Sequence, residues 1–341
     1  MQAVVLAGGF GTRLAPLTYT RPKPLLPILN KPMMQHLVEA LPPHTQVILA
    51  TNYKTQMIEE HFRQMGRPIL VNEEPRPLGT GGATKFAEDY IDGTFLVLNS
   101  DILSSLNFRR FIQFHRDNKA LATISLWPVE NVQEFGVADV QPDGRITSFV
   151  EKPRREDAPS NLINAGAYCL EPEVLDYIPP DKMVSMEQEI FPKIIGEGRR
   201  FYGYPLEGFW IDVGRPASYL KANLTLMKRR DVSQVVGTGS RISGQLHQAC
   251  VGRDCMVAEE AQVSSSVLYD RVTVEEGARL DICIVGEGCT VGSHARLSNV
   301  VVGDGETIDD DAHLENTAVW TRPRPEGYPD RQIGNPVKEQ G

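Results

Sequence analysis

The sequence predicts an α/β fold with a mostly parallel, doubly wound sheet, followed by a short triangular solenoid. Two observations carry this prediction. In the first half of the chain, short β-branched and aliphatic runs alternate with longer stretches of helical periodicity. In the last third, small residues and aliphatic anchors recur with a constant step of 17 residues.

Four continuous apolar runs in the first half are expected to be buried strands, because a parallel sheet is covered on both faces. They are Val4–Leu6, Val47–Ala50, Ile69–Val71 and Phe95–Leu98. Helices are expected between them, at residues 32–41, 54–65 and 80–90. Ligands of such sheets bind at the carboxyl ends of the strands. Functional loops are therefore expected directly after these four runs.

The last third repeats three aliphatic anchors, six, six and five residues apart, with small or polar residues between them. The anchors are Val251, Val257, Val263, Leu268, Val274, Leu280, Val285, Val291, Leu297, Val302, Ile308 and Leu314. One inward anchor on each of three flat sides is what a triangular coil requires. The pattern resembles the hexapeptide repeats of left-handed parallel β-helices. A β-sandwich of short strands is the alternative, but its strands would not repeat at so constant a spacing in the sequence.

These patterns set the expected domain boundaries. The α/β domain is expected over residues 1–230, the β-helix over 238–320, and an irregular, proline-rich tail over 321–341. The polar stretch 227–237 is the expected junction. An open end of so short a solenoid would leave unpaired backbone groups, so a homo-oligomer that uses the β-helix is expected.

Composition excludes several classes of function. A net charge of −9 argues against nucleic-acid binding, which depends on clustered Lys and Arg. The first residues lack a basic signal region and no apolar run is long enough to span a bilayer, so a cytoplasmic protein without a membrane partner is expected. The five cysteines form no CxxC pair and are expected to be reduced, packed residues.

A glycine-rich turn directly follows the first expected strand. It reads Leu-Ala-Gly-Gly-Phe-Gly-Thr-Arg-Leu over residues 6–14, and a Pro-Lys-Pro-Leu-Leu-Pro segment over 22–27 follows. Backbone N–H groups of such a turn approach phosphates closely, and Arg13 and Lys23 add positive charge. The turn is not a Walker A motif, because it lacks Gly-Lys-Ser/Thr. It is not a dinucleotide fingerprint either, because Leu14 stands at the third glycine position.

Further polar motifs are candidates for binding a nucleotide, a metal ion or a sugar phosphate. Gly-Thr-Gly-Gly at 79–82 begins the third expected helix, Asp101 follows the strand at 95–98, and Asp212 lies in Trp-Ile-Asp-Val-Gly. Two carboxylates together with phosphate oxygens suit Mg²⁺. Glu-Lys-Pro at 151–153 and Asn-Ala-Gly at 164–166 complete the set. Taken singly, each of these motifs could also be an ordinary turn, a helix cap or a solvated ion pair.

Taken together, these motifs resemble the sugar-1-phosphate nucleotidylyltransferase family, from the first residue through the solenoid. The resemblance implies a Rossmann-like nucleotidyltransferase domain with a mostly parallel mixed sheet, and an enzyme that makes an NDP-sugar and pyrophosphate with Mg²⁺. It implies that the nucleotide is held by the glycine turn and the third-helix motif. These residues are Leu6, Ala7, Gly8, Gly9, Gly11, Thr12, Arg13, Lys23, Gly79 and Thr80.

The same resemblance assigns the other roles. The sugar phosphate is held by Glu151, Lys152, Asn164 and Gly166. Catalysis falls to Arg13, Lys23 and Asp101, and the metal ligands are Asp101 and Asp212. Glu187 lies in a helix-like segment near the expected sugar site.

The motifs leave the substrates open. The arrangement is most similar to mannose-1-phosphate guanylyltransferases, which implies GTP and mannose-1-phosphate. The alternative pair is dTTP or UTP with glucose-1-phosphate or an N-acetylated sugar-1-phosphate. Two other classes are a non-catalytic regulatory subunit and a bifunctional enzyme whose β-helix transfers an acyl group. Retention of the cations and carboxylates favours an enzyme, and His294 and His313 are expected to face outward from the solenoid.

Overall fold

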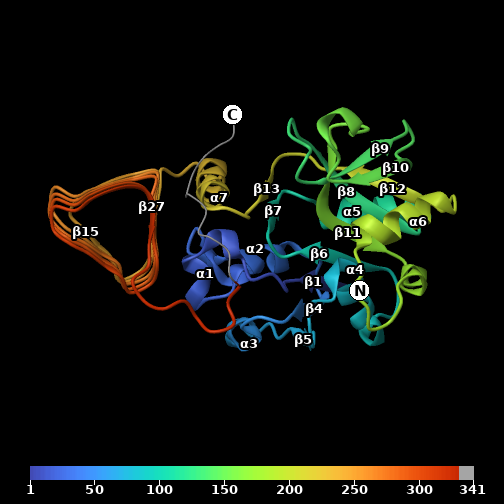
Figure 1. Ribbon diagram of the computed structural model, residues 1–341, viewed down its shortest axis with the longest axis horizontal. Coiled ribbons are helices and arrows are strands. Elements are labelled where there is room, and N and C mark those ends of the chain that lie inside the picture. Colours follow the sequence, from blue (N-terminus) through green and yellow to red (C-terminus); the bar gives the residue numbers. More distant parts are fainter. Residues whose placement is uncertain (330–341) are drawn as a thin grey trace. The chain divides into compact units, whose positions relative to one another are not determined.

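The computed structural model describes residues 1–329, which form two compact units (Figure 1). The first comprises Met1–Gly9 and Leu37–Trp210, and the second joins Phe10–His36 to the chain from Ile211 onward. The segment that carries Arg13 and Lys23 therefore belongs to the compact unit that contains the solenoid. The boundaries expected from sequence, 1–230, 238–320 and 321–341, remain a prediction, and residues 330–341 of the expected tail lie outside the described residues.

A nine-stranded mixed sheet forms the centre of the first unit, in the order β10-β9-β11-β6-β1-β4-β5, with β8 beside β11 and β12 beside β8. The strands are β1 (Gln2–Leu6), β4 (Gln46–Thr51), β5 (Leu70–Glu73), β6 (Phe95–Asn99), β8 (Ala122–Pro128), β9 (Gly136–Val140), β10 (Ile146–Glu151), β11 (Leu162–Leu170) and β12 (Phe201–Pro205). Strands β6, β1, β4 and β5 run parallel, and β11 joins β6 antiparallel. The four expected strands are all present, so the predicted α/β fold is confirmed.

The helices follow the predicted alternation. They are α2 (Met33–Ala40), α3 (Thr55–Gln64), α4 (Gly79–Phe86), α5 (Phe108–Asp117) and α6 (Phe191–Gly196), with a π-helical turn over Met186–Ile190. Helix α5 begins where the Asn107 side chain accepts a 3.1 Å hydrogen bond from the Arg110 N–H, an N-cap that its sequence favours. Its buried face holds Phe108, Phe111 and Ile112. Within residues 1–329, no helix is both long and apolar enough to cross a membrane.

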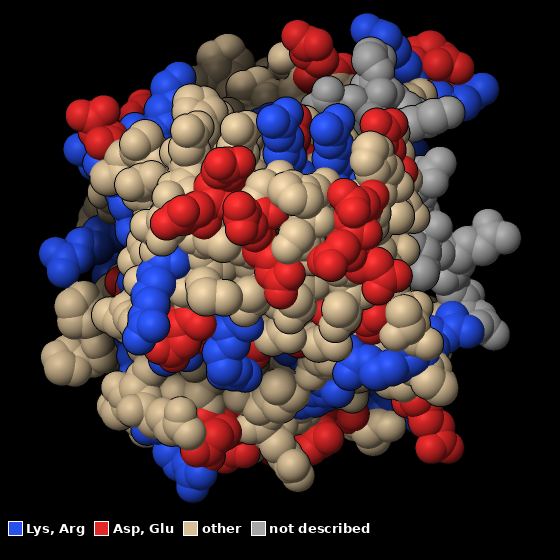
Figure 2. Space-filling model, turned by 90° about the vertical axis from the view of Figure 1, so that its left-hand side faces the viewer, with Lys and Arg blue, Asp and Glu red and all other residues tan. Residues whose placement is uncertain are grey.

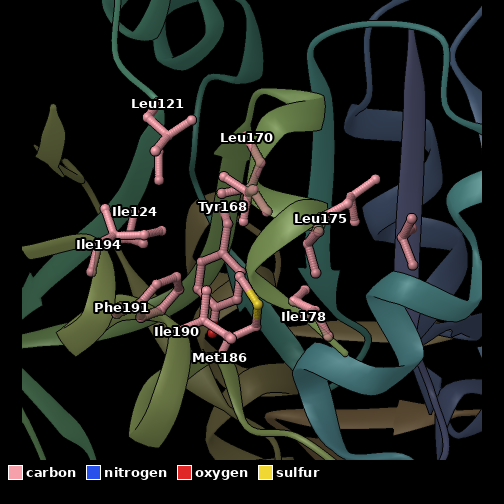
Figure 3. Close-up of a cluster of buried hydrophobic side chains, with 14 of the residues drawn as sticks. Leu121, Ile124, Tyr168, Leu170, Leu175, Ile178, Met186, Ile190, Phe191 and Ile194 are labelled. Atoms are coloured by element: carbon pink, nitrogen blue, oxygen red, sulfur yellow. The ribbon is translucent and has the colours of Figure 1, made fainter. Parts of the chain in front are cut away.

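Tyr168 on β11 stands in an extensive cluster of buried apolar side chains of this unit (Figure 3). Its fully buried ring meets Phe191 edge-on, with centroids 5.2 Å apart, beside Met186 and Ile190. A buried tyrosine needs a hydrogen-bond partner for its hydroxyl. The core therefore fixes where that hydroxyl group lies, which matters for the site described below.

Parallel strands wind along three sides of a triangular solenoid in the second unit (Figure 1). They are β14 (Gln234–Val236), β15 (Arg241–Ile242), β16 (Gln245–His247), β17 (Ala249–Val251), β18 (Met256–Val257), β19 (Gln262–Ser264), β20 (Val267–Leu268), β21 (Thr273–Val274), β22 (Arg279–Asp281), β23 (Ile284–Val285), β24 (Thr290–Val291), β25 (Arg296–Val302), β26 (Thr307–Ile308) and β27 (His313–Val319). The 17-residue step appears directly as strand pairing, from Val257 to Val274 to Val291. The predicted anchors form its core, and the architecture is consistent with the predicted left-handed β-helix.

The solenoid begins one coil before the 17-residue repeat does. Gln234 pairs with Ala249 and Arg241 with Met256, a step of 15 residues, before Gln245 pairs with Gln262 at the regular 17. Most of this coil lies within the β-helix expected over 238–320, but a coil two residues shorter falls out of phase with the repeat, so the predicted anchors begin only at Val251. Helix α7 (Pro216–Arg229) ends just before this coil, within the stretch 227–237 that the sequence marks as the expected junction.

The turns of the solenoid are polar. After β18, β21 and β26 they hold the carboxylates of Glu259, Glu260, Glu275, Glu276, Asp309, Asp310 and Asp311. Figure 2, turned so that the left-hand side of Figure 1 faces the viewer, shows carboxylates gathered in the middle of this face with Lys and Arg side chains around them. His294 and His313 are exposed, as predicted. Polar turns around an aliphatic core are what the repeat requires of a soluble coil.

Residues 10–36 pack within the second unit as short elements: 3₁₀ turns at Thr12–Leu14 and Lys23–Leu25, α1 (Leu17–Thr20), β2 (Pro27–Ile28) and β3 (Lys31–Pro32). The Leu29 N–H donates to Asn223 Oδ1 of α7 at 2.9 Å. The Asn30 amide donates to the Val251 carbonyl of the solenoid at 2.7 Å. None of these elements is long enough to be stable alone, so this packing determines their conformation.

Candidate active site

The loops after β1, β4 and β6 come together at one edge of the sheet, as predicted. The Ala7 N–H donates to Ala50 O at 2.8 Å, and the Ser100 N–H donates to Leu6 O at 3.1 Å. A methyl group built on Gly8 would lie 3.5 Å from Glu74 Oε1, whereas one built on Gly9 would meet no atom within 4 Å. The backbone at Gly9 is therefore open to a close neighbour, as a phosphate-binding turn requires.

Two residues beside this turn were not singled out in the sequence. Glu74 is only 6% exposed and accepts a 3.0 Å hydrogen bond from the Leu78 N–H, and burial raises the pKa of its carboxyl group. Asn52 Oδ1 is buried, lies 3.7 Å from a methyl group built on Gly8, and accepts no hydrogen bond from residues 1–329. Both follow the carboxyl ends of strands, so strand position was the signal that could have found them.

The glycines of the α4 motif are explained by packing. Gly79 has a φ of +73°, and a methyl group there would lie 2.6 Å from Val184 O. The Gly81 N–H donates to the same carbonyl at 2.9 Å. The close approach that these glycines allow is therefore to the backbone around Val184. Their predicted contact with a nucleobase stays a prediction.

A chain of hydrogen bonds joins Thr80 to Asn164. Thr80 Oγ1 donates to Glu187 Oε2 at 2.6 Å, and the Tyr168 hydroxyl donates to Glu187 Oε1 at 2.8 Å. The Asn164 amide donates to the Tyr168 oxygen at 2.8 Å, and Ser185 Oγ donates to Glu187 Oε2 at 2.8 Å. The structure thus brings together residues predicted for the nucleotide and the sugar, through Glu187 and through Tyr168, which the sequence analysis missed.

Gly166 stands at an irregularity of β11, where the register with β8 shifts between Asn164 and Tyr168. Its φ of +76° is costly for other residues. Its N–H donates to Asn164 Oδ1 at 3.0 Å, and a methyl group there would lie 2.8 Å from Asn99 Nδ2. Asn164 is thus held by a local backbone bond on one side and by Tyr168 on the other. The Asn-x-Gly motif is a strand irregularity that aims an amide.

Glu151 ends β10, and Lys152 follows it directly. Burial raises the pKa of Glu151, and the negative charge of Glu187 raises it further, whereas Lys152 opposes the shift. Lys152 Nζ lies 3.7 Å from Glu151 Oε1, and its side chain is 61% exposed. The carboxylates of Glu151 and Glu187 therefore lie near the ammonium group of Lys152. Carboxylates accept hydrogen bonds from hydroxyl ligands, and an ammonium group binds phosphate.

Asp101 follows β6 and is partly exposed. It sits one residue after Ser100, whose N–H is bound to the end of β1. It caps no long helix, since Asn107 caps α5. Capping of α5, one ordinary role for a carboxylate after a strand, therefore belongs to Asn107 and not to Asp101.

The second unit contains the other predicted residues. Gly11 has a φ of +68°, and a methyl group there would lie 3.1 Å from Lys23 Cβ, so the turn and the 7% exposed lysine are in contact. Thr12 and Arg13 form the 3₁₀ turn that follows Gly11. A methyl group on Gly214 would lie 3.1 Å from Asp212 Oδ1 and 3.3 Å from Arg13 Nη2. The structure thus places Lys23 against Gly11, and it places both the Arg13 guanidinium and the Asp212 carboxylate beside Gly214.

The donor atoms limit which metal fits. Within residues 1–329, no three His, Cys, Asp or Glu side chains are grouped to hold a metal ion by themselves. Zinc and calcium sites draw most of their ligands from the protein. Mg²⁺ is held by one or two carboxylates together with substrate phosphates and water, so Asp101 and Asp212 are suitable ligand types for it.

Comparison with known proteins identifies the class. Residues 2–229 match the family described as Nucleotidyl transferase, which covers more than half of the chain. The chain belongs to this nucleotidyltransferase family. Residues 231–324 match the family described as GMPPB C-terminal domain. The predicted nucleotidyltransferase enzyme is therefore confirmed, and members of the family generally use a divalent metal ion.

Relatives of this nucleotidyltransferase match over most of its length. Probable mannose-1-phosphate guanylyltransferase 3 of Oryza sativa subsp. japonica is 37% identical over 300 residues, covering 83% of this chain and 80% of the relative. Mannose-1-phosphate guanyltransferase of Saccharomyces cerevisiae is 39% identical over 259 residues, covering 72% and 70%. Mannose-1-phosphate guanylyltransferase of Mycobacterium tuberculosis is 34% identical over 300 residues, covering 82% and 83%.

Proposed function

We propose that this nucleotidyltransferase transfers a guanylyl group from GTP to mannose-1-phosphate, giving GDP-mannose and pyrophosphate. The observation that carries the proposal is that relatives from a plant, a yeast and a bacterium, each matched over at least 70% of its length, have names that specify this reaction. The phosphate and metal motifs do not distinguish nucleobases. The second candidate pair is therefore dTTP or UTP with glucose-1-phosphate.

The nucleotide is assigned to the glycine turn and the α4 motif. In the first unit these residues are Leu6, Ala7, Gly8, Gly9, Gly79 and Thr80, and in the second they are Gly11, Thr12, Arg13 and Lys23. The open backbone at Gly9 supports the assignment. Arg13 and Lys23 are assigned to the triphosphate because they supply the charge that a polyphosphate needs.

The sugar phosphate is assigned to Glu151, Lys152, Asn164 and Gly166. Support comes from the hydrogen-bond chain that fixes the Asn164 amide and from the two neighbouring carboxylates, Glu151 and Glu187. Carboxylates accept hydrogen bonds from sugar hydroxyls, and an exposed lysine binds a phosphate. Lys152 is therefore proposed to orient the attacking phosphate.

The proposed reaction is a single in-line displacement. An oxygen of the sugar phosphate forms a bond to the α-phosphorus, and the bond from that phosphorus to the leaving pyrophosphate breaks. A phosphate anion is already a competent nucleophile, so the enzyme's contribution is positioning and charge neutralisation. Mg²⁺, when bound, would neutralise charge on phosphate oxygens, and Asp101 and Asp212 are its proposed ligands.

Two further proposals concern the state of the protein. We propose a homo-oligomer that uses the β-helix, because β27 in the last coil pairs only with β25 and presents its other edge to no strand of residues 1–329. Light scattering coupled to size-exclusion chromatography tests this. A cytoplasmic location also stays a proposal, supported by relatives whose names are those of enzymes that act on a sugar phosphate.

A pyrophosphate-release matrix tests the function. GTP, ATP, UTP, CTP and dTTP are each paired with mannose-1-phosphate, glucose-1-phosphate and N-acetylglucosamine-1-phosphate. The proposal expects the highest kcat/KM for GTP with mannose-1-phosphate. A clear preference for another pair would overturn the substrate assignment, and release with no pair would overturn the proposed function.

A further inference from the structure

The described residues after the last coil, 320–329, form a strap that returns to the N-terminal segment of the same unit. Trp320 meets Tyr19 with ring centroids 5.1 Å apart, and Tyr328 meets Tyr19 at 4.8 Å and Phe10 at 5.9 Å. Tyr328 is 7% exposed. Three aromatic contacts thus hold the strap against residues 10–20.

The Tyr328 hydroxyl group reaches the glycine turn through one residue. Tyr328 Oη and Thr18 Oγ1 are 2.7 Å apart, and Thr18 Oγ1 donates to the Gly11 carbonyl at 3.0 Å. Because the Thr18 proton is used on Gly11, the Thr18 oxygen accepts from Tyr328. Tyr328 Oη also lies 3.3 Å from the Phe10 carbonyl. Tyr328 has one hydroxyl proton, so its link to the turn runs through Thr18 to the Gly11 carbonyl.

The packing around Gly11 leaves little room for movement. A methyl group built there would lie 2.9 Å from Thr18 Cγ2 and 3.1 Å from Lys23 Cβ. Thr18 therefore touches Gly11 with its methyl group and binds it with its hydroxyl. Since Gly11 also contacts Lys23, a displaced Thr18 would alter both the turn and the lysine that follows it.

The residues that follow Thr18 are bound to the solenoid. Thr20 Oγ1 donates to Asp304 Oδ2 at 2.6 Å, and Arg21 pairs with Asp304 at 2.7 Å and with Glu287 at 2.6 Å. The Arg21 side chain is only 16% exposed and its guanidinium lies 5.0 Å from the Tyr269 ring centroid. Partly buried, multiply bonded ion pairs of this kind fix geometry.

From these contacts we infer that Tyr328 is a positioning residue for nucleotide binding, acting through Thr18 on the glycine turn that carries Gly11, Arg13 and Lys23. The inference rests on the proposed function, in which these residues hold the triphosphate. Residues 10–25 contain no regular element longer than four residues, so their shape depends on such anchors. Tyr328 itself need not touch substrate.

The kinetic test compares Tyr328→Phe, Thr18→Val and the double variant in the full chain. Loss of one buried hydrogen bond is expected to raise KM for the nucleoside triphosphate about tenfold, with KM for the sugar-1-phosphate unchanged. The double variant should be no worse than either single variant, because both break the same link. Tyr177→Phe is the matched control, since Tyr177 is a partly buried residue of the other unit whose hydroxyl bonds, within residues 1–329, to Glu197 and Arg199 and not to the turn.

A second readout does not need turnover. Hydrogen exchange of the full chain should show faster amide exchange over residues 10–25 in Tyr328→Phe than in Tyr177→Phe. Unchanged exchange there, or an equal rise of both KM values, would overturn the inference while leaving the proposed function intact. If the wild-type protein releases no pyrophosphate with any pair, the proposed function fails, and the exchange result alone then decides whether Tyr328 orders the turn.

Discussion

Thr80 Oγ1 donates a 2.6 Å hydrogen bond to Glu187 Oε2. Glu187 accepts at the same time from Tyr168 and Ser185, so one carboxylate collects three hydroxyl donors. Charge-assisted bonds of this kind are stronger than neutral ones and fix the orientation of every member. The start of α4 and the irregular part of β11 are thereby held in one arrangement.

Thr80→Val keeps the shape of the side chain and removes its hydroxyl. Glu187 would lose its shortest bond, so we expect kcat/KM for the sugar-1-phosphate to fall by about tenfold. Steady-state kinetics measure it. Thr84→Val is the control, because Thr84 lies one turn further along α4 and its hydroxyl donates to the Thr80 carbonyl and not to Glu187. Equal losses in both variants would show that the effect arises from the helix and not from Glu187.

Glu187→Gln should shift the ionisation of Glu151. Burial and the charge of Glu187 raise the pKa of Glu151, and Lys152 lowers it. Removing the Glu187 charge therefore lowers that pKa, so Glu151 stays ionised to lower pH and the acidic limb of kcat/KM moves down the pH scale. Lys152→Met should move the limb the opposite way. Glu189→Gln is the control in the same segment and should leave the pH profile unchanged. If the acidic limb of kcat/KM also stays fixed in Glu187→Gln and Lys152→Met, Glu151 is not the group that gives rise to it.

The sequence predicted the strands and coils because both leave strong apolar patterns. Val4–Leu6 and Phe95–Leu98 read as continuous buried runs, and Val257, Val274 and Val291 recur in phase. No anchor was predicted before Val251, because the 15-residue step of the first coil breaks that phase. Periodicity detects repeated environments, and a single shortened coil is not repeated.

The site was predictable only in part. Asn164 and Thr80 stand in motifs, so the sequence singled them out. Tyr168 looks like any core aromatic, and only the fold shows that its hydroxyl bridges Asn164 and Glu187. Which residues meet across distant segments depends on the register of β11, including its irregularity at Gly166, and no local pattern encodes that.

Gly166→Ala should damage both stability and turnover. A side chain at φ +76° is strained, and its methyl group would lie 2.8 Å from Asn99 Nδ2. We expect a loss of about 1–3 kcal/mol in unfolding free energy, together with weaker sugar-phosphate binding as Asn164 is displaced. Urea unfolding and kinetics measure the two effects. Gly196→Ala is the control: it ends helix α6, meets nothing within 4 Å and should be neutral or slightly stabilising.

Asp101→Asn should remove most turnover while leaving the fold intact. The amide keeps the shape of the carboxylate but loses the charge that would hold a metal ion, so we expect kcat to fall by about 10²-fold or more. The Mg²⁺ concentration for half-maximal rate should rise in this variant, and chelation should abolish the wild-type rate. Asp92→Asn, at an exposed position before β6, is the control. Wild-type turnover in Asp101→Asn would exclude the assignment.

Leu280→Ala and Leu314→Ala test how much an inner coil and the last coil of the solenoid each contribute to stability. The two leucines occupy equivalent positions in different coils, and their strands pair with the strand of Leu297 from opposite sides. Leu280 is 2% exposed with a coil on each side, so its truncation should cost about 2–5 kcal/mol in unfolding free energy. Leu314 is only partly buried in the last coil and should cost clearly less. Arg279→Ala, at an exposed neighbour, is the control, and denaturant unfolding at fixed protein concentration measures all three. A loss at Leu314 equal to that at Leu280 would contradict this prediction and would show that the last coil contributes as much to the solenoid core as an inner coil.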